Sequence, residues 1–293
     1  MKKLKNEYEQ MLYDDRLKRC EDIPQGWYKI FVKIFIEMPL WLQKLAQNIV
    51  SFFVQSNLNF LAIIFGSDKY GPNAHSYTPH YMTHFKTRRY KKLKLLEIGV
   101  GGYGNPISGG GGLRMWKRYF PNSKIFGVDI YDKSALEEHR IKIFKGSQVD
   151  SVFLDSMVKQ TGDFDIIIDD GSHINEHVIE TFKILFPKLN YGGIYVIEDM
   201  STSYCPRLGG DNENLNNPNT IMNFFKKLTD SLNYQEYRID TLDLGEQEAL
   251  RPTAQIEANK ISYYDGKIIS MHFYHNLLFV YKGFNNEKSN VEC

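Results

Sequence analysis

From residue 94 onward, hydrophobic positions fall into short continuous runs that alternate with longer amphipathic segments. Continuous apolar runs of five or six residues are typical of strands that are buried on both faces of a parallel sheet. The runs predict strands over residues 94–98, 124–130, 141–145, 164–169 and 193–198. The segments between them predict helices over residues 113–120, 152–160 and 175–185. This alternation predicts an α/β fold with a doubly wound, mostly parallel sheet.

The last two apolar runs, residues 268–275 and 277–281, follow one another almost without a connection. Parallel neighbours would need a long crossover, so this spacing predicts an antiparallel hairpin. Residues 202–219 contain Gly, Pro, Asn and Asp in a long stretch beyond a predicted strand. Such a stretch is either a lid over a binding site or a disordered insertion, and the pattern favours neither.

Residues 27–65 are rich in aromatic and aliphatic side chains at roughly helical spacing. Their uncharged part, residues 45–67, contains too many Gln, Asn and Ser side chains for a membrane-spanning helix. We therefore predict a helical N-terminal subdomain over residues 1–65 that packs on the core or on another subunit, giving a homo-oligomer. Peripheral contact of an amphipathic helix with a membrane is the alternative. A turn-rich junction then predicts that a second domain occupies residues 66–293.

Composition narrows the function classes only slightly. The 293 residues include 36 basic and 35 acidic side chains, so no global field attracts nucleic acid. The three cysteines, Cys20, Cys205 and Cys293, are too few and too scattered for a disulfide framework, which predicts a cytoplasmic protein. The first residues are not followed by an apolar segment, so no signal peptide is expected.

A glycine-rich turn follows the first predicted strand. Gly99, Gly101 and Gly104 fit the pattern G-x-G-x-x-G, in which glycines let backbone N–H groups approach a nucleotide. Asp129 ends the next predicted strand, where its carboxylate can accept both ribose hydroxyls. These residues suit a dinucleotide or S-adenosylmethionine. A wide turn over residues 105–112 then separates the glycines from the next helix, so no obvious phosphate-binding feature follows them. This favours a cofactor without pyrophosphate.

Acidic residues gather where two further predicted strands end. Asp169 and Asp170 follow one strand, and Glu198 and Asp199 follow the next. Carboxyl ends of parallel strands meet at the edge where α/β folds bind ligands, and clustered carboxylates repel one another unless they share a proton or a cation. Oxygen ligands suit Mg²⁺ or another hard divalent cation. Each carboxylate could instead cap a helix or pair with a basic side chain.

Two histidines lie beside this acidic cluster. His173 and His177 are four residues apart, so they would share one helix face and could bind zinc if Ser172 capped that helix. Alternatively, His173 acts as a general base. If Asp170, Glu198 and Asp199 held a metal ion that also bound substrate oxygens, His173 could remove a hydroxyl proton while a methyl group is transferred.

These residues together resemble the class I S-adenosylmethionine-dependent methyltransferases, and among them the metal-dependent macrolide-sugar O-methyltransferases. The resemblance covers about residues 66–282. It is carried by residues 97–103, 113–121, 128–130, 169–173, 195–199 and 273–276.

The resemblance implies a seven-stranded sheet whose last strand is reversed, with Asp170, Glu198 and Asp199 as metal ligands and His173 as the base. It also implies which residues line the cofactor site. We assign to this site Ser67, Tyr77, Glu97, Gly99, Gly101, Asp129, Gln148 and Asp169. Ser67 and Tyr77 would belong to a segment that closes over the cofactor.

The acceptor is predicted less directly. Residues 1–65 resemble no part of that family, and abundant Lys, Asn, Ile, Phe and Tyr suggest an AT-rich genome. We therefore expect a sugar of a surface polysaccharide, methylated while it is nucleotide-linked, with Tyr204 and Arg207 as acceptor contacts. The alternatives are a glycosylated small molecule such as a macrolide, an NAD-dependent sugar oxidoreductase, and a non-catalytic partner subunit.

Overall fold

A computed structural model of the chain describes residues 34, 37–71, 74–237 and 262–287. The chain forms two compact units. The helical unit comprises residues 1–89 and 114–121, and the sheet unit comprises residues 90–113 and 122–293. Cys20 and Cys293 lie outside the described residues.

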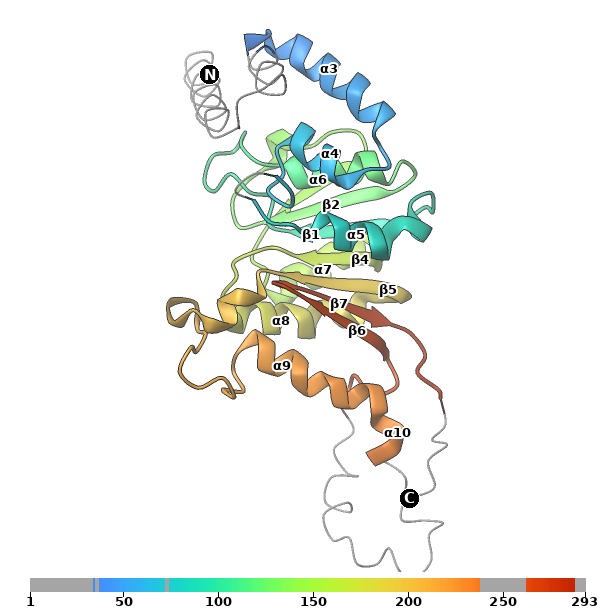
Figure 1. Ribbon diagram of the computed structural model, residues 1–293, viewed down its shortest axis with the longest axis vertical. Helices are drawn as coiled ribbons and strands as arrows, with labels where there is room; N and C mark the ends of the chain where they lie inside the picture. The colour runs from blue at the N-terminus through green and yellow to red at the C-terminus, as the bar shows by residue number, and fades with distance from the viewer. Residues whose placement is uncertain (1–33, 35–36, 72–73, 238–261, 288–293) are drawn as a thin grey trace, which may run out of the picture. The chain divides into compact units, whose positions relative to one another are not determined.

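The sheet unit is built on a seven-stranded sheet in the order β3-β2-β1-β4-β5-β7-β6 (Figure 1). Its strands are β1 (Lys94–Ile98), β2 (Lys124–Asp129), β3 (Ile141–Lys145), β4 (Phe164–Asp169), β5 (Leu189–Glu198), β6 (Ile268–Tyr274) and β7 (Leu277–Lys282). Strands β1 to β5 pair in parallel, whereas β7 runs antiparallel to both β5 and β6. The predicted α/β fold, the terminal hairpin and the reversed last strand are all confirmed.

Strand β5 begins four residues earlier than the apolar run predicts. Gly192, with φ of +80°, and Gly193 separate Leu189 from that run. The pairing of β4 with β5 also shifts register between Phe164 and Ile166. The glycines therefore allow an irregularity that the strand crosses without ending.

Three helices cover one face of the sheet. The helices and 3₁₀ segments of this unit are α6 (Gly111–Tyr119, which continues into the helical unit), η2 (Ser134–Leu136), α7 (Ser151–Thr161), α8 (Asn175–Leu185), η3 (Phe186–Lys188), η4 (Met200–Tyr204), η5 (Pro206–Leu208), α9 (Ile221–Leu228), η6 (Thr229–Asn233) and α10 (Tyr234–Tyr237). Leu154 of α7, Phe182 of α8 and Phe225 of α9 share a core with alternate strand residues such as Leu96 and Tyr195. This core fixes the carboxyl ends of β4 and β5.

The helical unit contains α3 (Leu40–Phe53), α4 (Leu58–Phe65), α5 (Thr78–Phe85) and η1 (Lys86–Arg88). Its core includes Tyr81, Phe85 and Trp116, whose rings lie 4.9–5.8 Å apart between centroids. The compact unit extends to Arg89, beyond the predicted boundary at residue 65. The assignment of residues 1–65 to packing or oligomerisation and of residues 66–293 to catalysis stays a prediction. Among the described residues, no helix is long and apolar enough to cross a membrane.

Candidate active site

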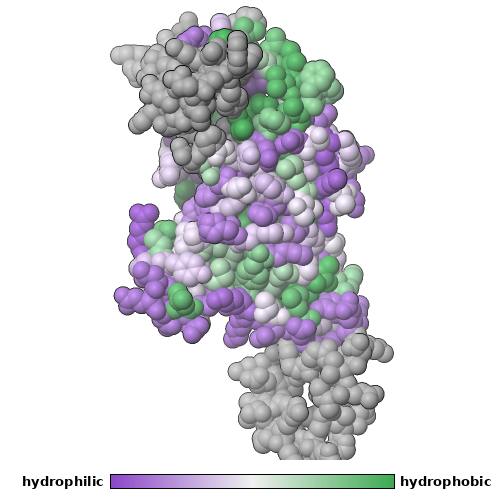
Figure 2. All heavy atoms as spheres, in the orientation of Figure 1, coloured by the Kyte–Doolittle hydropathy of each residue, from purple (hydrophilic) through white to green (hydrophobic). Residues whose placement is uncertain are grey.

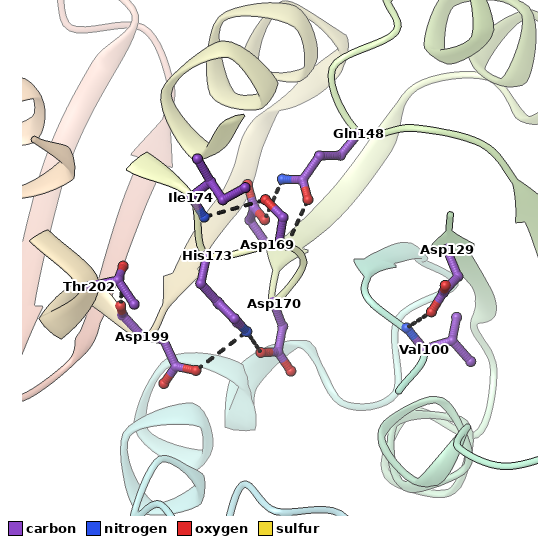
Figure 3. A network of polar contacts seen from close by, with 10 residues as sticks. Val100, Asp129, Gln148, Asp169, Asp170, His173, Ile174, Asp199 and Thr202 are labelled. Atoms are coloured by element: carbon purple, nitrogen blue, oxygen red, sulfur yellow. Dashed lines mark hydrogen bonds and ion pairs between the residues drawn. The ribbon is translucent and has the colours of Figure 1, made fainter. Parts of the chain in front are cut away.

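Asp170, His173 and Asp199 converge beyond the ends of β4 and β5 (Figure 3). The Nε2 atom of His173 lies 3.6 Å from Oδ2 of Asp199 and 4.0 Å from Oδ1 of Asp170. One ligand atom from each residue lies within 4.8 Å of the other two. All three side chains are partly exposed, so a ligand can reach them. The structure thus brings together three of the residues that we predicted for metal binding and proton transfer.

Two of these residues have a left-handed backbone. His173 has φ of +58° and Asp199 has φ of +54°, a region that costs an L-residue roughly 1–2 kcal/mol. The carbonyl of Asp199 accepts hydrogen bonds from the N–H and the Oγ1 hydroxyl of Thr202. The N–H of Asp170 donates to the carbonyl of Ile98 on β1. Strained backbone that neighbouring bonds hold in place is typical of functional sites.

Asp169 lies behind this cluster and not in it. Its side chain is 1% exposed, and burial raises the pKa of its carboxyl to about 7. Oδ1 accepts a hydrogen bond from Gln148, whereas Oδ2 is buried without a hydrogen-bond partner among the described residues. Asp169 therefore contributes less negative charge to the site near neutral pH than an ordinary aspartate would.

Gln148 ties the turn after β4 to α8. Its Nε2 donates to Asp169 and to Oγ1 of Thr181, and its Oε1 accepts from the N–H of Ser172 (Figure 3). A Cβ atom on Gly171 would lie 2.3 Å from this Oε1. Both donors and one acceptor position of the amide are therefore used within the protein. The structure supports a role in shaping the turn, and its predicted contact with a cofactor stays a prediction.

The paired-histidine arrangement is wrong. Helix α8 begins at Asn175 with Ile174 as its N-cap, so His173 precedes the helix. Ser172 does not cap it, and its hydroxyl instead lies 3.0 Å from Nδ1 of His177. His177 is not part of the group formed by Asp170, His173 and Asp199, so the structure does not bring the two histidines together in one set of candidate metal ligands.

Glu198, predicted as a metal ligand, is buried at the end of β5 and is not a member of the group formed by Asp170, His173 and Asp199. It is the last residue of β5, and Asp199 follows it with a left-handed backbone that redirects the chain. Its role in binding a metal ion stays a prediction.

The glycine turn lies directly against the acidic cluster. Gly99 has φ of +90°, and a Cβ atom there would lie 2.0 Å from the carbonyl oxygen of Asp170. The next N–H, that of Val100, donates to Oδ2 of Asp129, whose Oδ1 accepts from the N–H of Tyr131 (Figure 3). Each Asp129 oxygen keeps a further lone pair for a ligand. At Gly101 the backbone is also left-handed, and a Cβ atom there would lie 4.0 Å from the Cα of Gly109, an ordinary contact within the turn.

Two buried charges shape this turn. Glu97 on β1 lies against the first residues of α6, because a Cβ atom on Gly112 would come within 2.7 Å of both carboxylate oxygens. A carboxylate is stabilised at a helix N-terminus. Lys133, which we did not predict, is fully buried and donates to the carbonyls of Asn105 and Ser108. The turn that we predicted to be wide is therefore held in place by a buried lysine.

Ser67 and Tyr77, the other predicted cofactor residues, belong to the helical unit. Tyr77 is buried at the N-terminus of α5, and its ring stacks on that of His75. The Oγ atom of Ser67 accepts a hydrogen bond from the N–H of Lys69. Their contact with a cofactor stays a prediction.

Residues 202–219 form a bonded loop, so the disordered alternative is wrong. The buried Asn175 holds this loop: its Nδ2 donates to the carbonyls of Thr202 and Leu208, at 2.9 and 3.0 Å. Its Oδ1 accepts from the N–H of Ile221, the first residue of α9, at 2.7 Å. Tyr204 and Arg207, the predicted acceptor contacts, are exposed on the loop. Asn175 gave no sequence signal because its partners lie 27 to 46 residues away.

No protein-family model matches the chain. The chain is 44% identical over 213 residues to mycinamicin VI 2''-O-methyltransferase of Micromonospora griseorubida, a match that covers 73% of this chain and 49% of that protein. It is 42% identical to 8-demethyl-8-alpha-L-rhamnosyl tetracenomycin-C 2'-O-methyltransferase of Streptomyces olivaceus, covering 77% of this chain and 54% of that protein.

A solved structure with a similar fold is MycE methyltransferase from the mycinamycin biosynthetic pathway in complex with Mg and SAH. Its TM-score is 0.70 and its sequence identity 42%, and the match covers 79% of this chain and 55% of that one. The chain thus spans about half the length of the relatives that it matches.

Proposed function

Because this chain belongs to the class I S-adenosylmethionine-dependent methyltransferases in fold and in sequence, we propose that it methylates a sugar hydroxyl of a glycosylated small molecule. S-adenosylmethionine is the methyl donor and Mg²⁺ the metal ion in this proposal. The observation that carries it is the placement of Asp170, His173 and Asp199 against the glycine turn.

The glycine turn fits a nucleoside cofactor. Backbone at Gly99 and Gly101 adopts positive φ, which glycine does without strain, so the turn can bring its N–H groups close to a ligand. Asp129 ends the neighbouring strand and can still accept ribose hydroxyls. A relative crystallised with SAH supports S-adenosylmethionine over the NAD that our oxidoreductase alternative requires.

The acidic cluster fits a hard divalent cation. Asp170 and Asp199 supply carboxylate oxygens, which Mg²⁺ prefers, and cysteine thiolates are absent from this cluster. These two residues would hold the ion, with Glu198 as a further candidate ligand. When bound, such an ion stabilises negative charge that develops on a hydroxyl oxygen. The relative with a similar fold was crystallised with Mg.

His173 can act as the general base. Its Nε2 faces the two carboxylates at 3.6 and 4.0 Å, so a proton taken from the acceptor hydroxyl produces an imidazolium beside two negative charges. The left-handed backbone at His173 and Asp199 aims both side chains at one point without side-chain rearrangement. The remaining task is to align the acceptor oxygen with the methyl group, which is mainly positioning.

The names of the relatives indicate the acceptor class. They describe a mycinamicin and a rhamnosyl tetracenomycin as substrates, both small molecules. They give no support to the nucleotide-linked or surface-polysaccharide sugar that we expected, and they favour our alternative of a glycosylated small molecule. Contact of Tyr204 and Arg207 with this acceptor remains part of the proposal.

Calorimetry and a methyl-transfer assay test the proposal. The purified protein should bind S-adenosylmethionine and not NAD, and it should methylate a rhamnosylated or macrolide acceptor in the presence of Mg²⁺. Asp170→Ala should abolish turnover and leave cofactor binding largely intact. The matched control is Asp155→Ala, which removes a surface carboxylate of α7 that pairs with Lys188.

Three outcomes contradict the proposal. Binding of NAD without S-adenosylmethionine would support the oxidoreductase. Methylation of nucleotide-sugars alone would restore the surface-polysaccharide acceptor. Absence of methyl transfer from the unaltered protein to any of these acceptors would leave the non-catalytic subunit as the better explanation.

A further inference from the structure

Helix α3 has its polar and apolar faces reversed relative to an ordinary surface helix. Gln43 and Ser51 on its inner side are 5% and 0% exposed. Phe52 and Phe53 on its outer side are 57% and 79% exposed. The amide of Gln47 donates to the carbonyl of Ile64 and so joins this helix to α4. A helix in water normally buries its apolar stripe, so this arrangement indicates contact with an apolar partner.

The exposed apolar side chains form one surface on α3 and α4, which we call the α3–α4 face. Its members are Leu45, Ile49, Phe52 and Phe53 of α3 and Phe60 and Ile63 of α4. The four α3 residues recur at the spacing of a single helical face. Figure 2 shows hydrophobic residues gathered over these two helices.

A cationic side chain borders this face. An open hollow of about 370 Å³ is lined by Asn48, Ile49, Phe52, Phe53 and Arg118. The guanidinium of Arg118 donates to Oδ1 of Asn48 at 3.0 Å, which holds it beside the two phenylalanines. The hollow therefore combines apolar walls with a positive charge, as an anionic amphiphile requires.

The described part of the helical unit has an excess of basic residues. Its described residues include eight lysines and arginines against two acidic residues, whereas the whole chain has a net charge of only +1. The basic residues are Lys44, Lys69, Lys86, Arg88, Arg89, Arg114, Lys117 and Arg118, and the acidic residues are Glu37 and Asp68. Neither α3 nor α4 contains a carboxylate. Of these basic residues, Arg118 borders the α3–α4 face, whereas Lys69 and Arg89 are buried. An apolar surface on a unit with excess positive charge complements an anionic bilayer.

We propose that the α3–α4 face binds peripherally to the surface of a bilayer containing anionic lipids. With 14 and 8 residues, α3 and α4 insert only their outer side chains, since no described helix could cross the membrane. The charge argues against a second copy as the occupant, because a symmetric dimer through this face would bring two positive units together. The proposal concerns the helical unit and does not rest on the proposed function.

Vesicle flotation of the full chain tests this inference. We expect it to float with phosphatidylcholine vesicles that contain phosphatidylglycerol, to bind pure phosphatidylcholine less, and to bind less as salt rises. Phe53→Ser should weaken vesicle binding about tenfold or more, because it removes an aromatic ring that would insert into the bilayer. Phe284→Ser, the same change at a residue of the sheet unit that is 68% exposed, should bind as the unaltered protein does.

Arg118→Gln separates charge from packing, since glutamine can still donate to Asn48. It should weaken binding to phosphatidylglycerol vesicles at low salt and make no difference to the weak binding of pure phosphatidylcholine. Failure of the full chain to float at low salt, or equal flotation of Phe53→Ser and Phe284→Ser, overturns the proposal. So does analytical ultracentrifugation that shows self-association abolished by Phe53→Ser, because the α3–α4 face would then join copies of the chain. Circular dichroism confirms that each variant is folded.

Discussion

Replacement of Asn175 by alanine should loosen the loop over residues 202–219 more than its small size suggests. The side chain is 1% exposed and makes three hydrogen bonds, to the carbonyls of Thr202 and Leu208 and from the N–H of Ile221. Each such bond contributes about 1 kcal/mol, and its loss leaves a buried backbone group unsatisfied. We therefore expect a loss of about 3–4 kcal/mol, a large part of a typical stability of about 5–15 kcal/mol.

The matched control is Asn122→Ala. The amide of Asn122 makes one hydrogen bond, to the carbonyl of Tyr90, and is exposed, so its loss should cost about 0.5–1 kcal/mol. Thermal unfolding should separate the two variants by roughly 4–12 °C. Hydrogen exchange should rise in residues 200–222 of the Asn175 variant and leave β1 to β4 unchanged. A difference below about 1 kcal/mol between the variants, or unchanged exchange in the loop, refutes the assignment of Asn175 as its anchor.

Other predictions concern the turn and the buried charges. Gly99→Ala should abolish cofactor binding in calorimetry because the new Cβ atom would collide with the backbone of Asp170. The control is Gly192→Ala, which is also at positive φ but has no atom within 4 Å of the new Cβ. It should lower the free energy of unfolding by only about 1–2 kcal/mol and bind the cofactor normally. Lys133→Met frees two carbonyls of the glycine turn and should weaken cofactor affinity about tenfold by calorimetry, since each charged hydrogen bond contributes about 1.5–3 kcal/mol; unchanged affinity counts against the lysine as the support of the turn. Because the pKa of Asp169 is raised, the folded state keeps a proton that the unfolded chain releases between about pH 4 and pH 7. The contribution of Asp169 to the free energy of unfolding, measured in chelator, should therefore be largest below about pH 4. It should fall by up to roughly 4 kcal/mol as pH rises through about 7. Asp169→Asn should flatten this part of the urea-unfolding profile, and parallel profiles would exclude Asp169 as its source. Chelation should stop methyl transfer and added Mg²⁺ should restore it, with S-adenosylmethionine binding retained throughout.

Much of the sheet unit was predictable because its strands are continuous apolar runs. Strands β1, β3 and β4 and helix α8 have the predicted bounds. Strands β1 and β4 are buried along almost their whole length, whereas β3 at the sheet edge exposes Lys142 and Lys145. The wrong start of β5 came from Gly192 and Gly193, which interrupt the apolar pattern without ending the strand. Patterns along the chain detect burial of a segment, and they do not detect a strand that continues through an irregularity.

Polar side chains inside the protein were the least predictable feature. Lys133 lies in a polar stretch that is typical of the surface, yet it is fully buried because two carbonyls of the glycine turn receive its ammonium group. Helix α3 shows the converse, since its pattern predicts an apolar face packed inside and the structure exposes that face. The carbonyl partners of Lys133 lie 25 and 28 residues away, and the partner that we propose for α3 is a bilayer. Neither partner can be predicted from the residues next to it in the sequence.

The ends of the strands predict which residues meet at the sheet edge, and they do not predict how those side chains are oriented. Parallel topology brings the ends of β4 and β5 together, which was enough to place Asp170 and Asp199 at one edge. Which side chains converge depends on the backbone beyond the strands. Positive φ at His173 and Asp199 redirects both side chains and produces a group that includes the histidine and leaves out Glu198. Aspartate and histidine adopt positive φ more often than most side-chain-bearing residues, yet still rarely, so the residue type alone did not predict it. The grouping of Asp170, His173 and Asp199 therefore depends on two residues whose place at the sheet edge was predictable and whose orientation was not.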